Sequence, residues 1–310
     1  MRSGKTNKKE VLFILGGSGF IGKNLSRFLL KKYKIYIISK NKASINIKGV
    51  YVIKADLTKK TIVRKIFKKF KSVNIVNCSG YINHSNIKEY QESEIINEHF
   101  LVIKNIFENI GLSKIKKFIQ LGSSDEYGSQ ISPLKEEMRE YPFSTYSFAK
   151  TAATHFLQMI YKTLNIDTVI LRVFLTYGPE QDSQRFIPQI IKGCLNDLSF
   201  PTSQGTQLRD FCYIDDLSRA IDICLSTKKK IGGEIINIGS GKPISIKKMI
   251  IQIQKTIGRG NPNFGVVKFR KGENMRLYPS VQKANRLLNW KPKISLEQGL
   301  KKTIEFYKKK

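Results

Sequence analysis

Ser123, Tyr146 and Lys150 are the residues whose types and spacing best suggest chemistry. Ser123 directly follows an apolar run, and the other two form a Tyr-x-x-x-Lys pattern. Residues four apart share one face of a helix, so we expect the Lys150 ammonium to lie beside the Tyr146 phenol and favour its ionised form. A phenol with an ordinary pKa of about 10 would then donate and accept protons near neutral pH. This spacing alone also arises by chance on many helices.

A glycine-rich turn near the N-terminus separates an apolar run from a helical pattern. Val11 to Leu15 predicts a buried strand, and the residues after it have the spacing Gly-x-x-Gly-x-x-Gly. In this context glycines let the backbone approach a pyrophosphate, while the helix N-terminus supplies amides and a positive dipole end. A turn with a structural role only is the alternative. The residues expected to bind a dinucleotide here are Gly16, Ser18, Gly19, Phe20, Ile21 and Gly22.

Together these motifs resemble the extended short-chain dehydrogenase/reductase family, which includes the NAD-dependent epimerases and dehydratases. The resemblance runs from Val11 to Tyr307 and includes other stretches in the family's order. They are Ala55-Asp56-Leu57, Asn77-Cys78-Ser79-Gly80, Leu171-Arg172, Tyr177-Gly178-Pro179, Arg209-Asp210-Phe211, Tyr213-Ile214-Asp215-Asp216 and Asn237-Ile238-Gly239-Ser240-Gly241. The resemblance implies cofactor contacts from Asp56, which should meet the adenine, and from Leu57, Cys78, Ser79, Gly80, Tyr146 and Lys150.

Strand-like runs alternate with helical patterns through the first 173 residues, which predicts an α/β fold of the Rossmann type. The sheet should be parallel and doubly wound, with a smaller C-terminal α/β substrate lobe. The predicted strands are 11–15, 35–38, 50–53, 73–76, 118–121, 168–173 and 234–238. We expect a flexible tail over 1–10, a dinucleotide-binding domain over 11–177 plus 213–241, and a nucleotide-sugar lobe over 178–212 plus 242–310.

The end of the second predicted strand bears on the choice of cofactor. An NAD-binding member would carry an acidic residue there for the ribose 2′-hydroxyl, but this chain has Ser39 and Lys40. Ser39 can hydrogen-bond to a 2′-phosphate, and Lys40 or Lys42 can neutralise it. We therefore predict NADP(H), with NAD(H) as the alternative because lysine is frequent throughout the chain.

The resemblance implies hydride transfer between a nicotinamide and a sugar carbon. Ser123 and Tyr146 would hold the carbonyl oxygen, Tyr146 would transfer the proton, and Lys150 would supply positive charge. Dehydratases of the family carry Thr-Asp-Glu where this chain has Ser123-Ser124-Asp125. Because Ser124 replaces the acid that water elimination needs, we do not expect dehydration.

We predict NADPH-dependent reduction of the 4-keto group of a nucleotide-linked 4-keto-6-deoxysugar. The basic end of the second strand favours this reaction, and Gly205 to Asp216 resembles CDP-abequose synthase and related reductases. The alternative is an NAD(P)-dependent 4-epimerase of a nucleotide hexose. A catalytically silent redox sensor is a more remote one, because a sensor needs neither Tyr146 nor Lys150.

Substrate binding should depend on basic side chains that face a diphosphate, for which Arg is geometrically preferred. Only 12 of the 55 basic residues are Arg, so each Arg in a family-like stretch is informative. Arg209 and Arg276 match the family's phosphate-binding arginines, although Arg209 could instead pair with Asp210. Ser124 and Asp125 are expected to bind the substrate.

Bulk properties set further limits on the function. A formal charge of +31 suggests a nucleic-acid partner, but the lysines are scattered over amphipathic segments and are better explained as solvated faces. The four cysteines and three histidines have no metal-like spacing, and no apolar run approaches the ~20 residues that span a bilayer. We therefore expect a cytoplasmic enzyme without a metal, nucleic-acid partner or membrane contact. The family commonly forms homodimers through two helices, here Glu92 to Ile110 and the helix that carries Tyr146.

Overall fold

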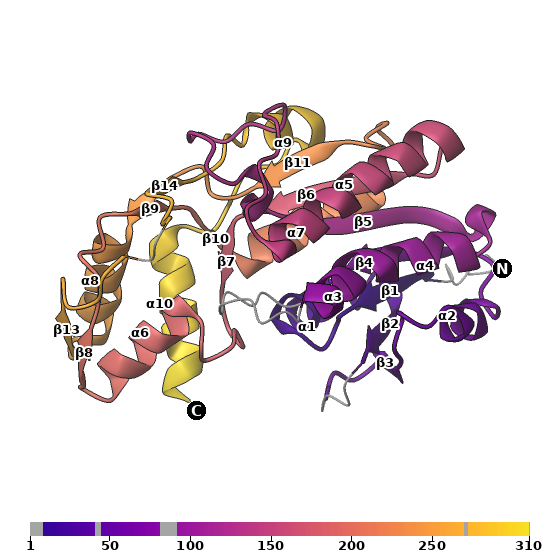
Figure 1. Ribbon diagram of the computed structural model, residues 1–310. Helices are drawn as coiled ribbons and strands as arrows, with labels where there is room; N and C mark the ends of the chain where they lie inside the picture. The colour runs from indigo at the N-terminus through magenta and orange to yellow at the C-terminus, as the bar shows by residue number, and fades with distance from the viewer. Residues whose placement is uncertain (1–8, 41–44, 81–91, 270–271, 310) are drawn as a thin grey trace. The chain divides into compact units, whose positions relative to one another are not determined.

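The computed structural model describes residues 9–40, 45–80, 92–269 and 272–309 (Figure 1). Lys42, His84 and residues 1–8 of the predicted tail lie outside these ranges. The first strand begins at Glu10, which the sequence had placed in the tail. The Glu10 carboxylate accepts a hydrogen bond from the Asn74 side chain at 2.9 Å and pairs with Lys116. These contacts explain why Glu10 is ordered as part of the sheet.

Seven strands form one sheet in the order β11-β6-β5-β4-β1-β2-β3. Their bounds are β1 Glu10–Leu15, β2 Tyr33–Ser39, β3 Tyr51–Lys54, β4 Val73–Asn77, β5 Ile115–Ser123, β6 Thr168–Val173 and β11 Ile235–Ile238. β1 lies between β2 and β4 and is parallel to both, so the strand order reverses beside β1. Open α/β sheets bind ligands at such a reversal, beyond the carboxyl ends of the strands. The predicted Rossmann-type α/β fold is confirmed.

The chain divides into two compact units. The first comprises Met1–Gly122, Phe143–Ile170 and Cys224–Glu234, and the second comprises Ser123–Pro142, Leu171–Ile223 and Ile235–Lys310. Two of the boundaries fall inside β5 and β6. The predicted division into a dinucleotide-binding domain and a sugar lobe stays a prediction.

The first unit contains the helices that flank the N-terminal strands. They are α1 (Phe20–Leu29), α2 (Lys60–Phe67), α3 (Glu92–Ile96), the π-helical turn η2 (Asn97–Leu101), α4 (Val102–Asn109), the 3₁₀ turn η3 (Leu112–Lys114) and α5 (Thr145–Leu164). α3, η2 and α4 follow one another without a break, and α5 packs against α3 and η2 (Figure 1). Apolar side chains that line up along β1 and α1, such as Leu12, Ile14, Leu25 and Leu29, are fully buried and form the core here.

The second unit is built from shorter elements. Its helices are the 3₁₀ turn η4 (Ser124–Tyr127), α6 (Phe186–Leu195), α8 (Ile246–Ile257), α9 (Gln282–Leu288) and α10 (Leu296–Lys308), and α7 (Ile214–Ser226) begins in it. Its short strands are β7 (Leu175–Tyr177), β8 (Ser199–Pro201), β9 (Leu208–Arg209), β10 (Phe211–Tyr213), β12 (Ile244–Ser245), β13 (Asn261–Asn263) and β14 (Arg276–Leu277). α6, α8 and α10 pack against one another (Figure 1). Among the described residues, no helix is both long and apolar enough to cross a bilayer.

Candidate active site

The glycine turn between β1 and α1 brings the backbone close to the segment after β4. Gly16 has φ +66°, and a Cβ there would lie 2.6 Å from the Ser79 Cα. A Cβ on Gly22 would lie 2.4 Å from the Gly17 Cα, so both positions need glycine. α1 begins after Gly19 with no side chain capping its first amides and no acidic residue in its first turn. These features fit the pyrophosphate of a dinucleotide.

The end of β2 touches this turn. The Ser18 and Ser39 hydroxyls lie 2.7 Å apart and share a hydrogen bond. Lys40, the next residue, donates to Glu98 at 3.3 Å. Ser18 and Ser39 therefore contact each other, and Lys40 follows directly after Ser39. The Lys40 ammonium has a carboxylate partner, Glu98, that was not predicted from the sequence.

The segment after β4 is held by its own side chains. Oδ1 of Asn77 accepts hydrogen bonds from the Ser79 backbone at 3.0 Å and from the Ser79 hydroxyl. Burial raises the pKa of the partly buried Cys78 to about 12, so this thiol is protonated at neutral pH. Cys194, Cys212 and Cys224 are buried free thiols, as the sequence predicts. Cys78 and Ser79 thus lie at the strand reversal, beside the glycine turn.

Asp56 and Leu57 follow β3 in the same unit. The Asp56 carboxylate accepts from the backbone and the hydroxyl of Thr58, at 3.0 and 2.6 Å. Burial alone would raise the pKa of Asp56, but these bonds and the Lys40 charge lower it, so the group is ionised. Leu57 is buried, and its carbonyl accepts from the Asn105 side chain at 3.1 Å. Asp56 is therefore available as a hydrogen-bond acceptor, whereas the Leu57 side chain is part of the buried core.

Tyr146 and Lys150 lie in the first two turns of α5, as the Tyr-x-x-x-Lys spacing predicts. Ser144 caps this helix, because its hydroxyl accepts from the Ser147 amide at 3.1 Å. Both functional side chains are buried, and the Lys150 ammonium lies 5.9 Å from the centre of the Tyr146 ring. Lys150 also donates to the Leu121 carbonyl of β5 at 2.9 Å. This bond ties the ammonium to the strand that ends at Ser123.

His99 is a neighbour of Tyr146 that the sequence patterns did not single out. Its buried imidazole meets the Tyr146 ring edge-on, with ring centres 5.0 Å apart. The imidazole also fills the space where a side chain on Gly80 would lie. No sequence pattern marks His99, because its direction depends on the π-helical turn η2. The His99 imidazole therefore packs against one side of the Tyr146 ring.

Ser123 belongs to the second unit, so its approach to Tyr146 stays a prediction. The Ser123 amide donates to Oε1 of Glu126 at 2.7 Å, and its hydroxyl accepts from the Asp125 amide at 3.1 Å. The other Glu126 oxygen accepts from Nε of Arg172 at 3.0 Å, and neither side chain of this pair is exposed. Arg172 also pairs with Glu140. The buried Glu126–Arg172 ion pair therefore fixes the backbone of Ser123. The Ser123 hydroxyl accepts one hydrogen bond, so its own proton can still be donated to a ligand.

The predicted substrate residues Ser124, Asp125 and Arg209 also lie in the second unit. Ser124 is buried, and the charge of Asp125 acts on Arg209. Arg209 pairs with Glu273 and not with Asp210. Burial lowers the pKa of Arg209, against the raising effect of Glu273, but the group stays charged. The alternative Arg209–Asp210 salt bridge is therefore wrong.

Asp210 has a different role. It is fully buried and accepts from the backbone and hydroxyl of Ser240, at 2.6 and 2.9 Å. In the parallel β9–β14 ladder Arg276 pairs with Leu208, while Arg209 pairs with Leu277, so the two arginines leave the backbone on opposite faces. Binding of one diphosphate by both arginines stays a prediction.

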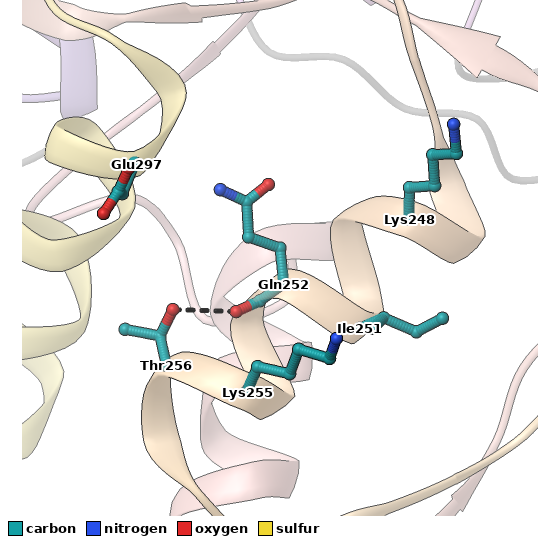
Figure 2. A pocket seen from close by; sticks show the side chains of 6 residues that line it. All are labelled: Lys248, Ile251, Gln252, Lys255, Thr256 and Glu297. Carbon is teal, nitrogen blue, oxygen red and sulfur yellow. Dashed lines mark hydrogen bonds between the residues drawn. The ribbon is translucent and has the colours of Figure 1, made fainter.

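A hollow on the surface of the second unit lies between α8 and α10. Figure 2 shows its lining: Lys248, Ile251, Gln252, Lys255 and Thr256 from α8, with Glu297 from the first turn of α10. The Thr256 hydroxyl donates to the Gln252 carbonyl at 2.8 Å, an ordinary bond within a helix. None of the predicted site residues lines this hollow, and no group of His, Cys, Asp and Glu in the described residues could hold a metal.

Comparison with known proteins gives a consistent result. The model of the NAD dependent epimerase/dehydratase family matches residues 12–239. A UDP-glucuronate 4-epimerase of Thermodesulfobacterium geofontis (strain OPF15) is 27% identical over 317 residues, covering 95% of each chain. A dTDP-glucose 4,6-dehydratase of Haemophilus influenzae (strain ATCC 51907 / DSM 11121 / KW20 / Rd) is 26% identical over 330 residues, covering 96% of this chain and 97% of that one. The solved structure of a Bacillus cereus UDP-glucuronic acid 4-epimerase, in complex with UDP-glucuronic acid and NAD, is 28% identical and superimposes with a TM-score of 0.87. It covers 96% of this chain and 99% of that one.

Proposed function

The chain belongs to the NAD dependent epimerase/dehydratase family, and from this premise we propose that it is an NAD-dependent 4-epimerase of a nucleotide-linked hexose. The supporting relatives are 4-epimerases that match nearly the whole chain. Their names make UDP-glucuronate the first substrate to try, and a further relative named a putative UDP-glucose 4-epimerase, of Methanocaldococcus jannaschii, 29% identical, adds UDP-glucose.

The observation that carries the choice of reaction is the buried serine at position 124. Dehydratases are also among the relatives, and their reaction needs a carboxylic acid where this chain has Ser124. A serine hydroxyl cannot supply that proton at neutral pH, whereas inversion at carbon 4 needs only the groups that handle the 4-oxygen. Epimerisation is therefore favoured over dehydration.

The residues expected to hold NAD are the glycine turn, the open start of α1, Asp56 and the segment Cys78 to Gly80. When bound, NAD would supply reversible hydride acceptance at carbon 4. Tyr146 would take the proton from the 4-hydroxyl and later return it to the oxygen. Lys150 would stabilise the ionised phenol by its charge, and Ser123 would hold the same oxygen by donating its hydroxyl proton.

Reduction of a 4-keto-6-deoxysugar, which the sequence favoured, loses its main support. That preference depended on Lys40 as a 2′-phosphate ligand, and Lys40 is paired with Glu98. The likeness to CDP-abequose synthase and an NADP(H) preference stay predictions. The family's dependence on NAD supports the epimerase instead.

The test is to incubate the purified protein with UDP-glucose and UDP-glucuronate in turn, and to resolve the carbon 4 isomers by chromatography. We expect interconversion of one pair with no net change in reduced-nicotinamide absorbance. Consumption of NADPH with a 4-keto-6-deoxysugar, without isomer formation from any hexose, would instead identify a reductase.

A further inference from the structure

The lysine at the end of β2 is held by a carboxylate from a distant part of the chain. The Lys40 ammonium lies 3.3 Å from Oε1 of Glu98, a residue of η2 that is 58 positions away in sequence. The two side chains are 54% and 26% exposed, so the pair is open to solvent and to a ligand.

This pair lies where the adenosine ribose of a bound dinucleotide is expected. β2 is the parallel neighbour of β1, and Ser39 at its end shares a 2.7 Å hydrogen bond with Ser18 of the glycine turn. In Rossmann-type folds the carboxyl end of this strand reaches the ribose 2′-hydroxyl. The Lys40–Glu98 pair therefore borders the position that distinguishes NAD from NADP.

Several carboxylates of the described residues act on Lys40. Besides Glu98, the carboxylates of Asp56 and Glu94 act on its ammonium. The hydrogen bond to Glu98 raises the pKa of Lys40 against the lowering effect of burial, and the ammonium stays charged. Lys59 also acts on Asp56. With three carboxylates of the described residues acting on it, the Lys40 ammonium attracts a dianionic phosphate less strongly.

The π-helical turn explains how Glu98 reaches Lys40. The Val102 amide donates to the Asn97 carbonyl, five residues back, so η2 holds one more residue than an α-helical turn. Within this wider turn Glu98 contacts Lys40 while His99 contacts Tyr146. π-Helical turns are rare and are frequent at functional sites.

We propose that Glu98 is the residue that makes this chain select NAD over NADP. Its carboxylate neutralises Lys40 and repels a 2′-phosphate, while it can accept a hydrogen bond from a free 2′-hydroxyl. The acidic group that most NAD-binding folds carry at the end of β2 is thus supplied from a helix. The inference rests on the proposed function only for its premise that a nicotinamide dinucleotide binds.

The experiment measures binding and not turnover. Purified protein is equilibrated with equal concentrations of NAD⁺ and NADP⁺ and separated by gel filtration, and the released dinucleotides are quantified. The wild-type protein should retain NAD⁺ in excess, and Glu98→Gln should shift the bound ratio toward NADP⁺ by about tenfold, because one negative charge is lost near the phosphate. Glu98→Asp keeps the charge and should keep the preference, and high salt should narrow the wild-type preference.

A matched control lies on the same continuous helix. Glu108 of α4 also pairs with a lysine, Lys104, at 3.0 Å and is half exposed, so Glu108→Gln removes a comparable charge away from Lys40. It should leave the bound ratio unchanged. An unchanged ratio in Glu98→Gln overturns the inference, while retention of NAD⁺ leaves the proposed function standing. A wild-type preference for NADP⁺ overturns the inference and also contradicts the NAD dependence of the proposed function. A wild-type protein that binds neither dinucleotide overturns both.

Discussion

Tyr146 is the residue on which turnover should depend most directly. Its phenol lies beside the Lys150 ammonium, which is itself anchored to the Leu121 carbonyl. Tyr146→Phe removes the proton-transferring oxygen and little else, so we expect a normal fold and normal NAD binding with turnover reduced about 10²–10⁴-fold. Steady-state kinetics and dinucleotide retention check this together. Unchanged turnover would remove Tyr146 from the mechanism.

Arg209 and Glu273 form a second testable pair. Glu273 pairs with the Arg209 guanidinium, which is expected to bind the substrate diphosphate. The diphosphate must therefore compete with the Glu273 carboxylate. Glu273→Gln should lower KM for the nucleotide-sugar by about two- to fivefold, the size expected of a partly exposed ion pair. kcat should change little, because neither residue handles the reacting carbon.

The opposite variant provides the control. Arg209→Met should raise KM, since the diphosphate loses its charged partner. A KM that stays the same in both variants would mean that Arg209 does not bind the substrate.

At the residue scale, sequence patterns located residues whose partners lie only a few positions away along the chain. The Tyr-x-x-x-Lys pair lies on a helix and the glycines lie in the turn before α1, as expected, because helix and turn geometry determine their placement. Their roles stay predictions. Glu98 and Glu273 were missed because they reach Lys40 and Arg209 from 58 and 64 positions away. No local pattern contains that information, and the frequency of lysine made Lys40 easy to misinterpret.

At the scale of elements, the buried ion pair behind Ser123 should be sensitive to the loss of one partner. Arg172 is fully buried between Glu126 and Glu140. Arg172→Met would leave two carboxylates without their counter-ion, so we expect the free energy of unfolding to fall by about 3–5 kcal/mol. Urea denaturation measures this, with Arg139→Met as a control because Arg139 is exposed. Equal stability of the two variants would contradict this role for Arg172.

The elements themselves were well predicted where the hydrophobic pattern is long. The seven strands lie within a few residues of the predicted runs because each combines apolar side chains with flanking turns. The π-helical turn η2 was not predicted, since an extra residue in one turn leaves the helical pattern almost unchanged. The opposite faces of Arg209 and Arg276 depend on strand register, which two-residue strands do not reveal in sequence.

At the scale of the whole molecule, the predicted homodimer remains to be tested. Phe148 and Met159 of α5 are 55% and 48% exposed, and residues eleven apart lie on one face of a helix. A second copy of the chain could cover this face. Analytical ultracentrifugation should give twice the mass of the 35.5 kDa chain, and Phe148→Glu should shift it toward the monomer. A monomeric wild-type protein would reject the dimer.

The most direct test of 4-epimerisation is proton NMR of the hexose nucleotide after turnover in deuterated water. Return of the same hydride from the bound nicotinamide to carbon 4, with Tyr146 moving only the hydroxyl proton, predicts inversion at carbon 4 with protium retained there and no deuterium elsewhere in the ring. Deuterium at carbon 5 with loss of water, or no inversion while reduced nicotinamide is consumed, would contradict the proposed epimerase.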